Sequence, residues 1–214
     1  MTGLEPFMIL CLCRHAESVA NVKDVIEGRR NSHLSPRGIR QARKLRSNIP
    51  FCPDVVYTSP LTRAIETAKL AFPMTEVRVV PDLIEGDAGR LEGRSLTDLT
   101  AEEHDQYQRM IDDPTFDARK VLSAEGVKEF LSRSIKVFEE IVWGAKDEGF
   151  QAIVLITHGG WINNIVARHL QLSQTRLGNC GFFLLRQVGN RWVLDYPTQK
   201  DLEGGEEKKK GRMV

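Results

Sequence analysis

Two short apolar runs, far apart in this chain, end in the same way. Residues 7–13 are followed by Arg14 and His15, and residues 152–157 are followed by His158 and two glycines. Continuous apolar runs of this length are typical of strands that are buried on both faces of a parallel sheet. In such sheets reactive groups collect at the carboxyl ends of the strands, where the next helices begin. The sequence therefore predicts that His15 and His158 share one site at that edge.

The remainder of the chain alternates short strands with amphipathic helices. The expected strands are 7–13, 54–57, 77–80, 152–157, 182–186 and 191–194, the last two forming a hairpin around Gly189 and Asn190. The expected helices begin at Pro36 with Ser35 as the N-cap, begin again at Ser59 and Pro60, and cover 126–143 and 161–170. Alternation of this kind predicts a three-layer α/β/α sandwich whose central sheet is mostly parallel, with an antiparallel edge strand.

The length of the chain favours a single domain. At 214 residues the chain can bury one full core. Residues 83–122 are polar and poor in β-branched side chains, so they interrupt the alternation. We therefore expect one domain over 1–203 with an inserted cap segment at about 86–122, followed by a charged, disordered tail at 204–214.

Charge and hydropathy exclude several classes of partner. The chain has 30 basic and 29 acidic residues, a net charge of +1, and so has no overall field that would attract nucleic acid or an anionic membrane. No apolar stretch approaches the roughly 20 residues that a membrane span needs, and the first residues lack the basic region of a signal peptide. We expect a soluble, cytoplasmic protein that binds neither nucleic acid nor membrane. Its cysteines show no paired metal-ligand spacing and are expected to be reduced structural thiols: Cys11, Cys13, Cys52 and Cys180.

The residues near the two histidines are suited to a phosphoryl group. Its negative oxygens require cationic forks and backbone amides in fixed positions, and Arg14 and Arg63 can supply two such forks. Gly159 and its neighbouring glycine allow close backbone approach at a helix N-terminus, and Asn21 adds a neutral donor. The chain has no glycine-rich Lys-Ser/Thr loop and no evident carboxylate cluster for magnesium, so we expect chemistry without a metal or cofactor.

Without a metal, a phosphate ester can be broken by covalent transfer to a side chain. His15, next to Arg14 on the first strand, is the predicted nucleophile, and His158 is expected to stabilise the transferring group. The leaving alkoxide needs a proton. Glu85 follows the third strand and can stand on the far side of the phosphate, first as the acid and afterwards as the base toward water.

These motifs resemble those of the histidine phosphatase superfamily, which has the phosphoglycerate mutase-like fold. The run Arg14-His15-Ala16-Glu17 is similar to the family signature Arg-His-Gly-Glu, with alanine in place of the usual glycine. The resemblance continues through 34–42, 59–68, 85–93 and 157–160. It implies that Arg14, Asn21, Arg63 and His158 bind phosphate, that His15 becomes a phosphohistidine and that Glu85 donates the proton. A weaker match at Ala124-Glu125-Gly126 indicates only where a long helix begins.

Three functions are compatible with this sequence. The favoured one is a phosphomonoesterase that acts on a small phosphorylated metabolite or a phosphoprotein through a phosphohistidine. The second is a mutase, but the span from Glu85 to His158 is shorter than in the mutases that the chain resembles, and Gly160-Trp161 resembles the phosphatases. The third is a silent phospho-ligand binding module, against which His15 and Glu85 both argue.

The sequence leaves the substrate and the oligomeric state open. One hypothesis concerns four loop arginines, which would line the rim of the pocket and select a second anionic group on the substrate: Arg29, Arg30, Arg90 and Arg94.

Overall fold

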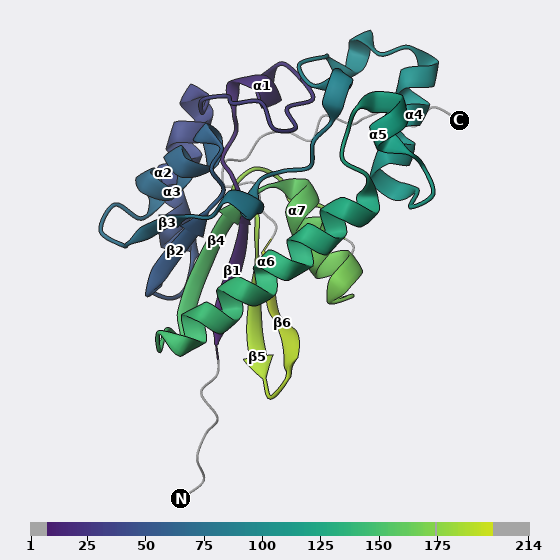
Figure 1. The fold of residues 1–214 in the computed structure, drawn as a ribbon. Helices are drawn as coiled ribbons and strands as arrows, with labels where there is room; N and C mark the ends of the chain where they lie inside the picture. The colour runs from purple at the N-terminus through teal and green to yellow at the C-terminus, as the bar shows by residue number, and fades with distance from the viewer. Residues whose placement is uncertain (1–7, 174, 199–214) are drawn as a thin grey trace, which may run out of the picture.

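Six strands form one sheet within the part of the chain that the structure describes, residues 8–173 and 175–198 of a computed structural model (Figure 1). The strands are β1 (Ile9–Arg14), β2 (Val55–Thr58), β3 (Val77–Val79), β4 (Ala152–Thr157), β5 (Phe182–Val188) and β6 (Arg191–Thr198). Their order is β3-β2-β4-β1-β5-β6. The first four in this order pair in parallel, while β5 is antiparallel to both β1 and β6. The predicted α/β fold is confirmed, with antiparallel pairing confined to the β5 and β6 side.

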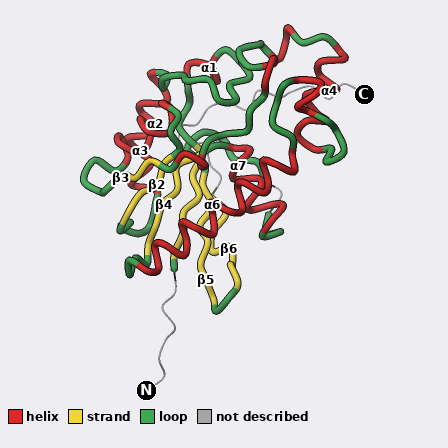
Figure 2. The backbone as a smooth tube through the Cα atoms, viewed as in Figure 1, coloured by secondary structure: helices red, strands yellow, loops and turns green. Residues whose placement is uncertain are grey.

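Helices cover both faces of the sheet (Figure 2). One layer holds α2 (Pro36–Asn48) and α3 (Thr62–Ala71). The opposite layer holds α6 (Val127–Asp147), α7 (Gly159–Asn163) and the π-helical η4 (Asn164–His169). Two hydrophobic cores therefore lie back to back, one on each side of the strands.

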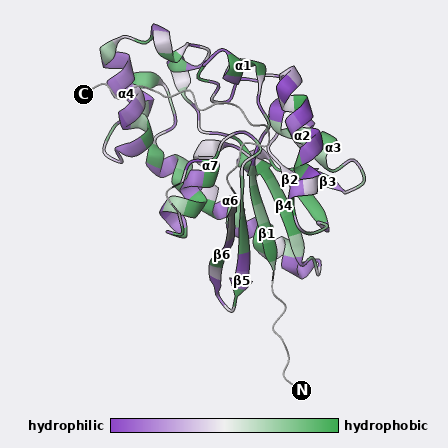
Figure 3. Cartoon of the chain, turned by 180° about the vertical axis from the view of Figure 1, so that it is seen from behind, coloured by the Kyte–Doolittle hydropathy of each residue, from purple (hydrophilic) through white to green (hydrophobic). Residues whose placement is uncertain are grey.

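The side chains of β1 show why its apolar run is continuous. Leu10 and Leu12 pack in the core beneath α6 and α7, whereas Cys11 and Cys13 pack in the core beneath α2 and α3. All four are 0% exposed. A strand that is buried on both faces needs apolar side chains at every position rather than at alternate ones, and Figure 3 shows the central strands as largely hydrophobic.

The predicted helix starts are partly right. Ser35 caps α2, because its Oγ accepts the backbone N–H of Gly38 at 2.9 Å and Pro36 occupies the first helical position. The next helix does not begin at Ser59 and Pro60. It begins at Thr62, after Leu61, because the hydroxyl of Ser59 accepts the N–H of Leu61 in a turn that precedes the helix. The helix expected over 161–170 begins at Gly159 and becomes π-helical from Asn164.

The segment between β3 and α6 lies over the carboxyl ends of the strands, together with α1 (Val19–Val22) (Figure 1). It consists of η1 (Pro81–Leu83), η2 (Gly89–Leu91), η3 (Leu96–Asp98), α4 (Ala101–Asp112) and α5 (Ala118–Leu122). Leu91, Leu99 and Leu122 form the centre of a separate small core. The division into a domain over 1–203 and a cap at about 86–122 stays a prediction, and the charged tail at 204–214 lies outside the described residues. In the described ranges, no helix has the length and apolar character needed to cross a membrane.

Candidate active site

The register of two neighbouring strands brings the predicted histidines together. In the parallel pair of β1 and β4, Arg14 lies opposite Thr157, so the residue that follows each strand is a histidine. The ring centroids of His15 and His158 are 5.2 Å apart. The side chains are nearly inaccessible to solvent, at 3% and 0% exposed. The expectation that the two strand ends share one site is confirmed.

Hydrogen bonds to His15 define which of its ring nitrogens carries the lone pair. Its Nδ1 lies 2.8 Å from the carbonyl oxygen of Ala16, which can only accept, so Nδ1 carries the hydrogen. Its Nε2 accepts from Nε of Arg63 at 3.2 Å. In the neutral ring the lone pair therefore lies on Nε2. Ala16 has a negative φ, so alanine fits the backbone where the family signature has glycine.

The charge state of both imidazoles follows from their surroundings. Burial, followed by the guanidinium groups of Arg63 and Arg14, holds the pKa of His15 well below its usual range. Burial and the same cationic surroundings, with Arg63 the largest of these, also hold the pKa of His158 well below that range. Both rings are therefore neutral near neutral pH, and a neutral imidazole is the form that has a lone pair.

Ser59 positions His158. The Ser59 hydroxyl lies 2.7 Å from Nε2 of His158, and both side chains are fully buried. Nδ1 of His158 is buried and has no hydrogen-bond partner among the described residues.

Arg63 connects α3 to the loop on the opposite side of the pocket. Its Nη1 donates to the carbonyl of Arg30 at 2.8 Å and its Nη2 to that of Gly28 at 2.9 Å. The residue is 1% exposed, so this guanidinium is fixed before any ligand binds. Arg14 is held by its Nη1, which donates to the carbonyl of Leu177 at 2.8 Å, while its Nε is buried without a partner.

Asn21 and an unpredicted acid, Glu27, lie beside these arginines. Nδ2 of Asn21 donates to Oε2 of Glu27 at 2.9 Å, and Oδ1 accepts from Asn179 at 3.0 Å. Oε1 of Glu27 lies 3.7 Å from Nη1 of Arg63. A carboxylate at this position offsets part of the positive charge of the arginines.

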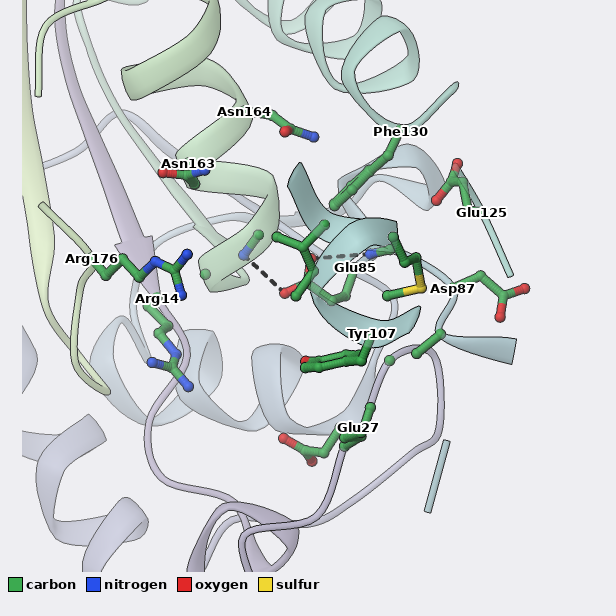
Figure 4. A pocket seen from close by; sticks show the side chains of 18 of the residues that line it. Arg14, Glu27, Glu85, Asp87, Tyr107, Glu125, Phe130, Asn163, Asn164 and Arg176 are labelled. Atoms are coloured by element: carbon green, nitrogen blue, oxygen red, sulfur yellow. Dashed lines mark hydrogen bonds between the residues drawn. The ribbon is translucent and has the colours of Figure 1, made fainter. Parts of the chain in front are cut away.

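Backbone amides hold the carboxylate of Glu85 on the other side of the pocket. Oε1 accepts the N–H of Gly86 at 3.0 Å, and Oε2 accepts that of Gly160 at 3.1 Å (Figure 4). A Cβ at position 160 would lie 2.6 Å from Oε1 of Glu85, so only glycine allows the carboxylate to lie against the first turn of α7.

Most of these groups line one cavity of about 370 Å³, which is within the usual range for small-molecule pockets. His158 and Ser59 are not among its lining residues, whereas Arg14, His15, Asn21, Arg63, Glu85 and Gly159 are. The lining also includes Tyr107, Met110 and Ile111 of α4, and Asn163, Asn164 and Arg168 of α7 and η4. In Figure 4, Tyr107 and Asn163 lie on opposite sides of Glu85. Within the described part of the chain, no group of three or more His, Cys, Asp and Glu side chains is arranged to hold a metal ion.

Residues 10–199 match the sequence profile of the histidine phosphatase superfamily, branch 1, which covers most of the chain. The chain belongs to the histidine phosphatase superfamily. A protein of Hydrogenobacter thermophilus, provisionally named phosphoserine phosphatase 2, is 31% identical over 87% of this chain and 93% of its own length. The adenosylcobalamin/alpha-ribazole phosphatase of Escherichia coli is 29% identical over 75% of this chain and 78% of its own length. A mycobacterial glucosyl-3-phosphoglycerate phosphatase structure superposes with a TM-score of 0.76 at 25% identity, covering 88% of this chain and 97% of the other.

The hypothesis that Arg29, Arg30, Arg90 and Arg94 line the rim of the pocket is wrong for this protein. None of the four arginines is among the residues that line the cavity, and each guanidinium is bonded elsewhere. Their partners are Glu125 for Arg29, the carbonyl of Glu92 for Arg30, Gln106 for Arg90 and Glu103 for Arg94. The cavity is lined instead by Arg168 and Arg176.

Sequence reasoning also missed several residues of this histidine phosphatase. Ser59 was interpreted only as the start of a helix, and Glu27 is an isolated acid in a loop with no motif of its own. Tyr107 has no signal, because the helix that contains it reaches the site only through the tertiary fold. Glu125, which also lines the cavity, does have a signal in the run Ala124-Glu125-Gly126, but its weak family match predicts only where a helix begins.

Proposed function

We propose that this histidine phosphatase hydrolyses phosphomonoesters of small metabolites, without a metal ion, through a phosphohistidine at His15. The observation that carries this proposal is the lone pair on Nε2 of His15. It is fixed there by the Ala16 carbonyl on Nδ1, and it faces the guanidinium of Arg63. The nucleophile is thus neutral, buried and oriented, and it lies beside the cation that would hold the phosphoryl oxygens.

The first half of the reaction transfers the phosphoryl group to His15. The Nε2 lone pair forms a bond to phosphorus as the bond from phosphorus to the ester oxygen breaks. The leaving oxygen takes the proton of Glu85, whose carboxyl group stands across the cavity. Arg14, Arg63, Asn21 and His158 bind the non-bridging oxygens, on which negative charge is spread.

The second half returns the enzyme to its starting state. Glu85, now a carboxylate, takes a proton from water, and the water oxygen attacks phosphorus as the bond to Nε2 breaks. Inorganic phosphate leaves, and His15 is again neutral. In a mutase the same phosphohistidine would pass its phosphoryl group to a second substrate hydroxyl instead of water.

The size of the cavity, about 370 Å³, favours a small metabolite over a phosphoprotein. Tyr107 and Met110 of α4 line it together with Glu85 and Asn163, so the group that carries the phosphate has to fit among these side chains. The named activities of the relatives, on phosphoserine and on alpha-ribazole phosphate, also involve small molecules. The cytoplasmic location and the lack of nucleic-acid partners stay predictions.

The deciding experiment measures phosphate release from a panel of phosphosugars, phosphoserine and phosphoglycerates in EDTA, with and without added 2,3-bisphosphoglycerate. We expect turnover by the wild type, loss of at least about 10³-fold in His15→Ala, and an acid-labile phosphoenzyme in the wild type alone. His33→Ala is the matched control, because the His33 ring is exposed and is paired with the surface carboxylate of Glu66.

Other outcomes would point elsewhere. Isomerised phosphoglycerate that appears only with the bisphosphate would identify a mutase. Unchanged turnover in His15→Ala would overturn the proposed mechanism. Failure of the wild type on the whole panel would favour the silent binding module.

A further inference from the structure

Glu125 lies between two arginines next to the active site. Its Oε2 accepts from Nη2 of Arg29 at 3.0 Å and from Nη2 of Arg133 at 2.9 Å, and its Oε1 accepts from Nε of Arg133 at 3.0 Å. Only 10% of the Glu125 side chain is exposed, and only 17% of that of Arg133. We call Arg29, Glu125 and Arg133 the clamp. Charge-assisted, two-point contacts of this kind fix orientation as well as adding energy.

The same two guanidinium groups also hold the backbone that carries Glu85. Nη1 of Arg133 donates to the carbonyls of Asp82 at 2.8 Å and Ile84 at 3.0 Å. Nη2 of Arg133 and Nε of Arg29 both approach the carbonyl of Glu85 itself, at 3.4 Å and 3.3 Å. The carbonyls of Asp82, Ile84 and Glu85 are thereby tied, through the two guanidinium groups, to one largely buried carboxylate.

Glu85 depends on this backbone for its position. The hydrogen bonds to its carboxylate come from the backbone amides of Gly86 and Gly160. Gly86 in turn is confined by Phe130, whose ring a Cβ at position 86 would approach at 2.9 Å. The guanidinium of Arg133 lies 4.9 Å from the centre of that ring. A shift of the clamp would therefore move both the backbone of Glu85 and the wall behind it.

We propose that Glu125, acting through Arg29 and Arg133, is a positioning residue that sets where the carboxyl group of Glu85 stands relative to the ester oxygen of the substrate. The proposal rests on the proposed function, in which Glu85 protonates that oxygen. Glu125 lines the same cavity, and in this proposal it acts through the two guanidinium groups that its carboxylate holds, not by contact with the phosphoryl group. Misplacing a proton donor by a fraction of an ångström is enough to lower its contribution to the rate.

The way the reaction rate depends on the leaving group distinguishes a role of Glu125 in positioning Glu85 from a merely structural role. An alkyl phosphate such as phosphoserine leaves as a strongly basic alkoxide and needs the proton of Glu85. p-Nitrophenyl phosphate leaves as a stable phenolate and hardly needs it. Since kcat/KM covers the steps through cleavage of the ester bond, we compare this constant for the two substrates.

We expect Glu125→Gln to lower kcat/KM for the alkyl phosphate by at least about tenfold more than for the aryl phosphate. Arg133→Lys should behave in the same way, because an ammonium group cannot reach Glu125 and the carbonyls together. Glu148→Gln is the matched control. It also removes a carboxylate partner of an arginine, Arg78 at 2.6 Å, but on the surface and away from the cavity. If Glu125→Gln fails to fold, the milder Arg29→Lys, at a residue with 36% exposure, carries the same comparison.

Glu85→Gln and the double variant Glu85→Gln with Glu125→Gln complete the test. Once the acid is absent its position no longer matters, so the double variant should be no slower on the alkyl phosphate than Glu85→Gln alone. Equal losses on both substrates in Glu125→Gln, beside a selective loss in Glu85→Gln, would overturn the positioning role and leave the proposed function intact. A Glu85→Gln variant without the selective loss would overturn both.

Discussion

His15 and His158 are buried among cationic groups, and this arrangement has opposite effects on catalysis and stability. The neutral ring that a phosphoryl acceptor needs is also a ring that resists protonation in the folded protein. Burial and the nearby arginines lower the pKa of both side chains well below the usual value. In the unfolded chain these rings would titrate near pH 6.5.

Stability should therefore fall with acid through these two histidines. Above about pH 6.5 both states hold them neutral, and their contribution is fully present. Below about pH 6.5 these histidines bind protons in the unfolded chain but not in the folded protein. Each histidine therefore lowers the free energy of unfolding by about 1.4 kcal/mol per pH unit until the pH reaches its pKa in the folded protein. Urea titrations at about pH 7.5 and 5.5 should show a smaller drop for His158→Asn than for the wild type. An equal drop in both would contradict the lowered pKa of His158.

At the scale of elements, the start of α2 is joined to the loop that follows β1. The hydroxyl of Ser35 donates to Oε1 of Glu17 at 2.6 Å, and the backbone N–H of Ser35 donates to the carbonyl of Glu17 at 2.9 Å. A Cβ at Gly38 would lie only 2.0 Å from that carbonyl oxygen. Glycine is needed here for close approach, since Gly38 is in a helix and requires no unusual φ.

Gly38→Ala should therefore destabilise the protein by about 1–3 kcal/mol, because α2 and the Glu17 backbone must separate. It should also lower turnover, since Glu17 lies two residues after His15. Gly144→Ala is the matched control in α6. No atom outside its own helix lies within 4 Å of the added Cβ, so this variant should gain up to about 1 kcal/mol from helix propensity. Thermal melts of the two variants test both predicted changes in stability. A Gly38→Ala variant as stable as the wild type would refute the close approach of α2 to the Glu17 carbonyl.

For the molecule as a whole, Arg168 of η4 connects the segment that lies over the strand ends to the helical layer that contains α6, α7 and η4. Its Nη2 donates to the carbonyl of Ile111 at 2.6 Å and to Oδ1 of Asp112 at 3.3 Å, at the end of α4. Its Nη1 donates to Oδ1 of Asn164 in η4 at 2.9 Å. Arg168 thus connects the end of α4, which lines the cavity, to the layer that contains η4.

Arg168→Met should loosen α4 without unfolding the sheet. We expect amide hydrogen exchange in 101–112 to speed up about tenfold, the effect of losing roughly 1.4 kcal/mol of local stability. Residues 127–147 serve as the internal control and should keep their wild-type rates. Lys136→Ala, which removes only an exposed pair with Glu140, should leave both segments unchanged. Unaltered exchange of α4 in Arg168→Met would show that this arginine does not hold the wall.

The elements and the two strand-end histidines could be predicted because their signals are local. An apolar run shows that a strand is buried on both faces, and the residue after it must lie at the edge of a parallel sheet. The positions of His15 and His158 could therefore be predicted from the sequence, and so could the arginines beside them and the Ser35 cap. The start of α3 was misplaced because Ser59 uses its hydroxyl for a turn and for His158, and a sequence does not show which partner a serine takes.

Short patterns of residues were enough to predict the α/β alternation, the two strand-end histidines and the family. Contacts made in the folded chain fix which nitrogen of His15 carries the lone pair, where Glu27 and Tyr107 lie, and that the four loop arginines do not line the cavity. Each of these depends on contacts between segments far apart in the chain, such as that of Arg29 with Glu125, 96 positions away. An exposed arginine can pair with any carboxylate within reach. Which pairs form in this protein therefore depends on how the segment above the sheet packs against α6.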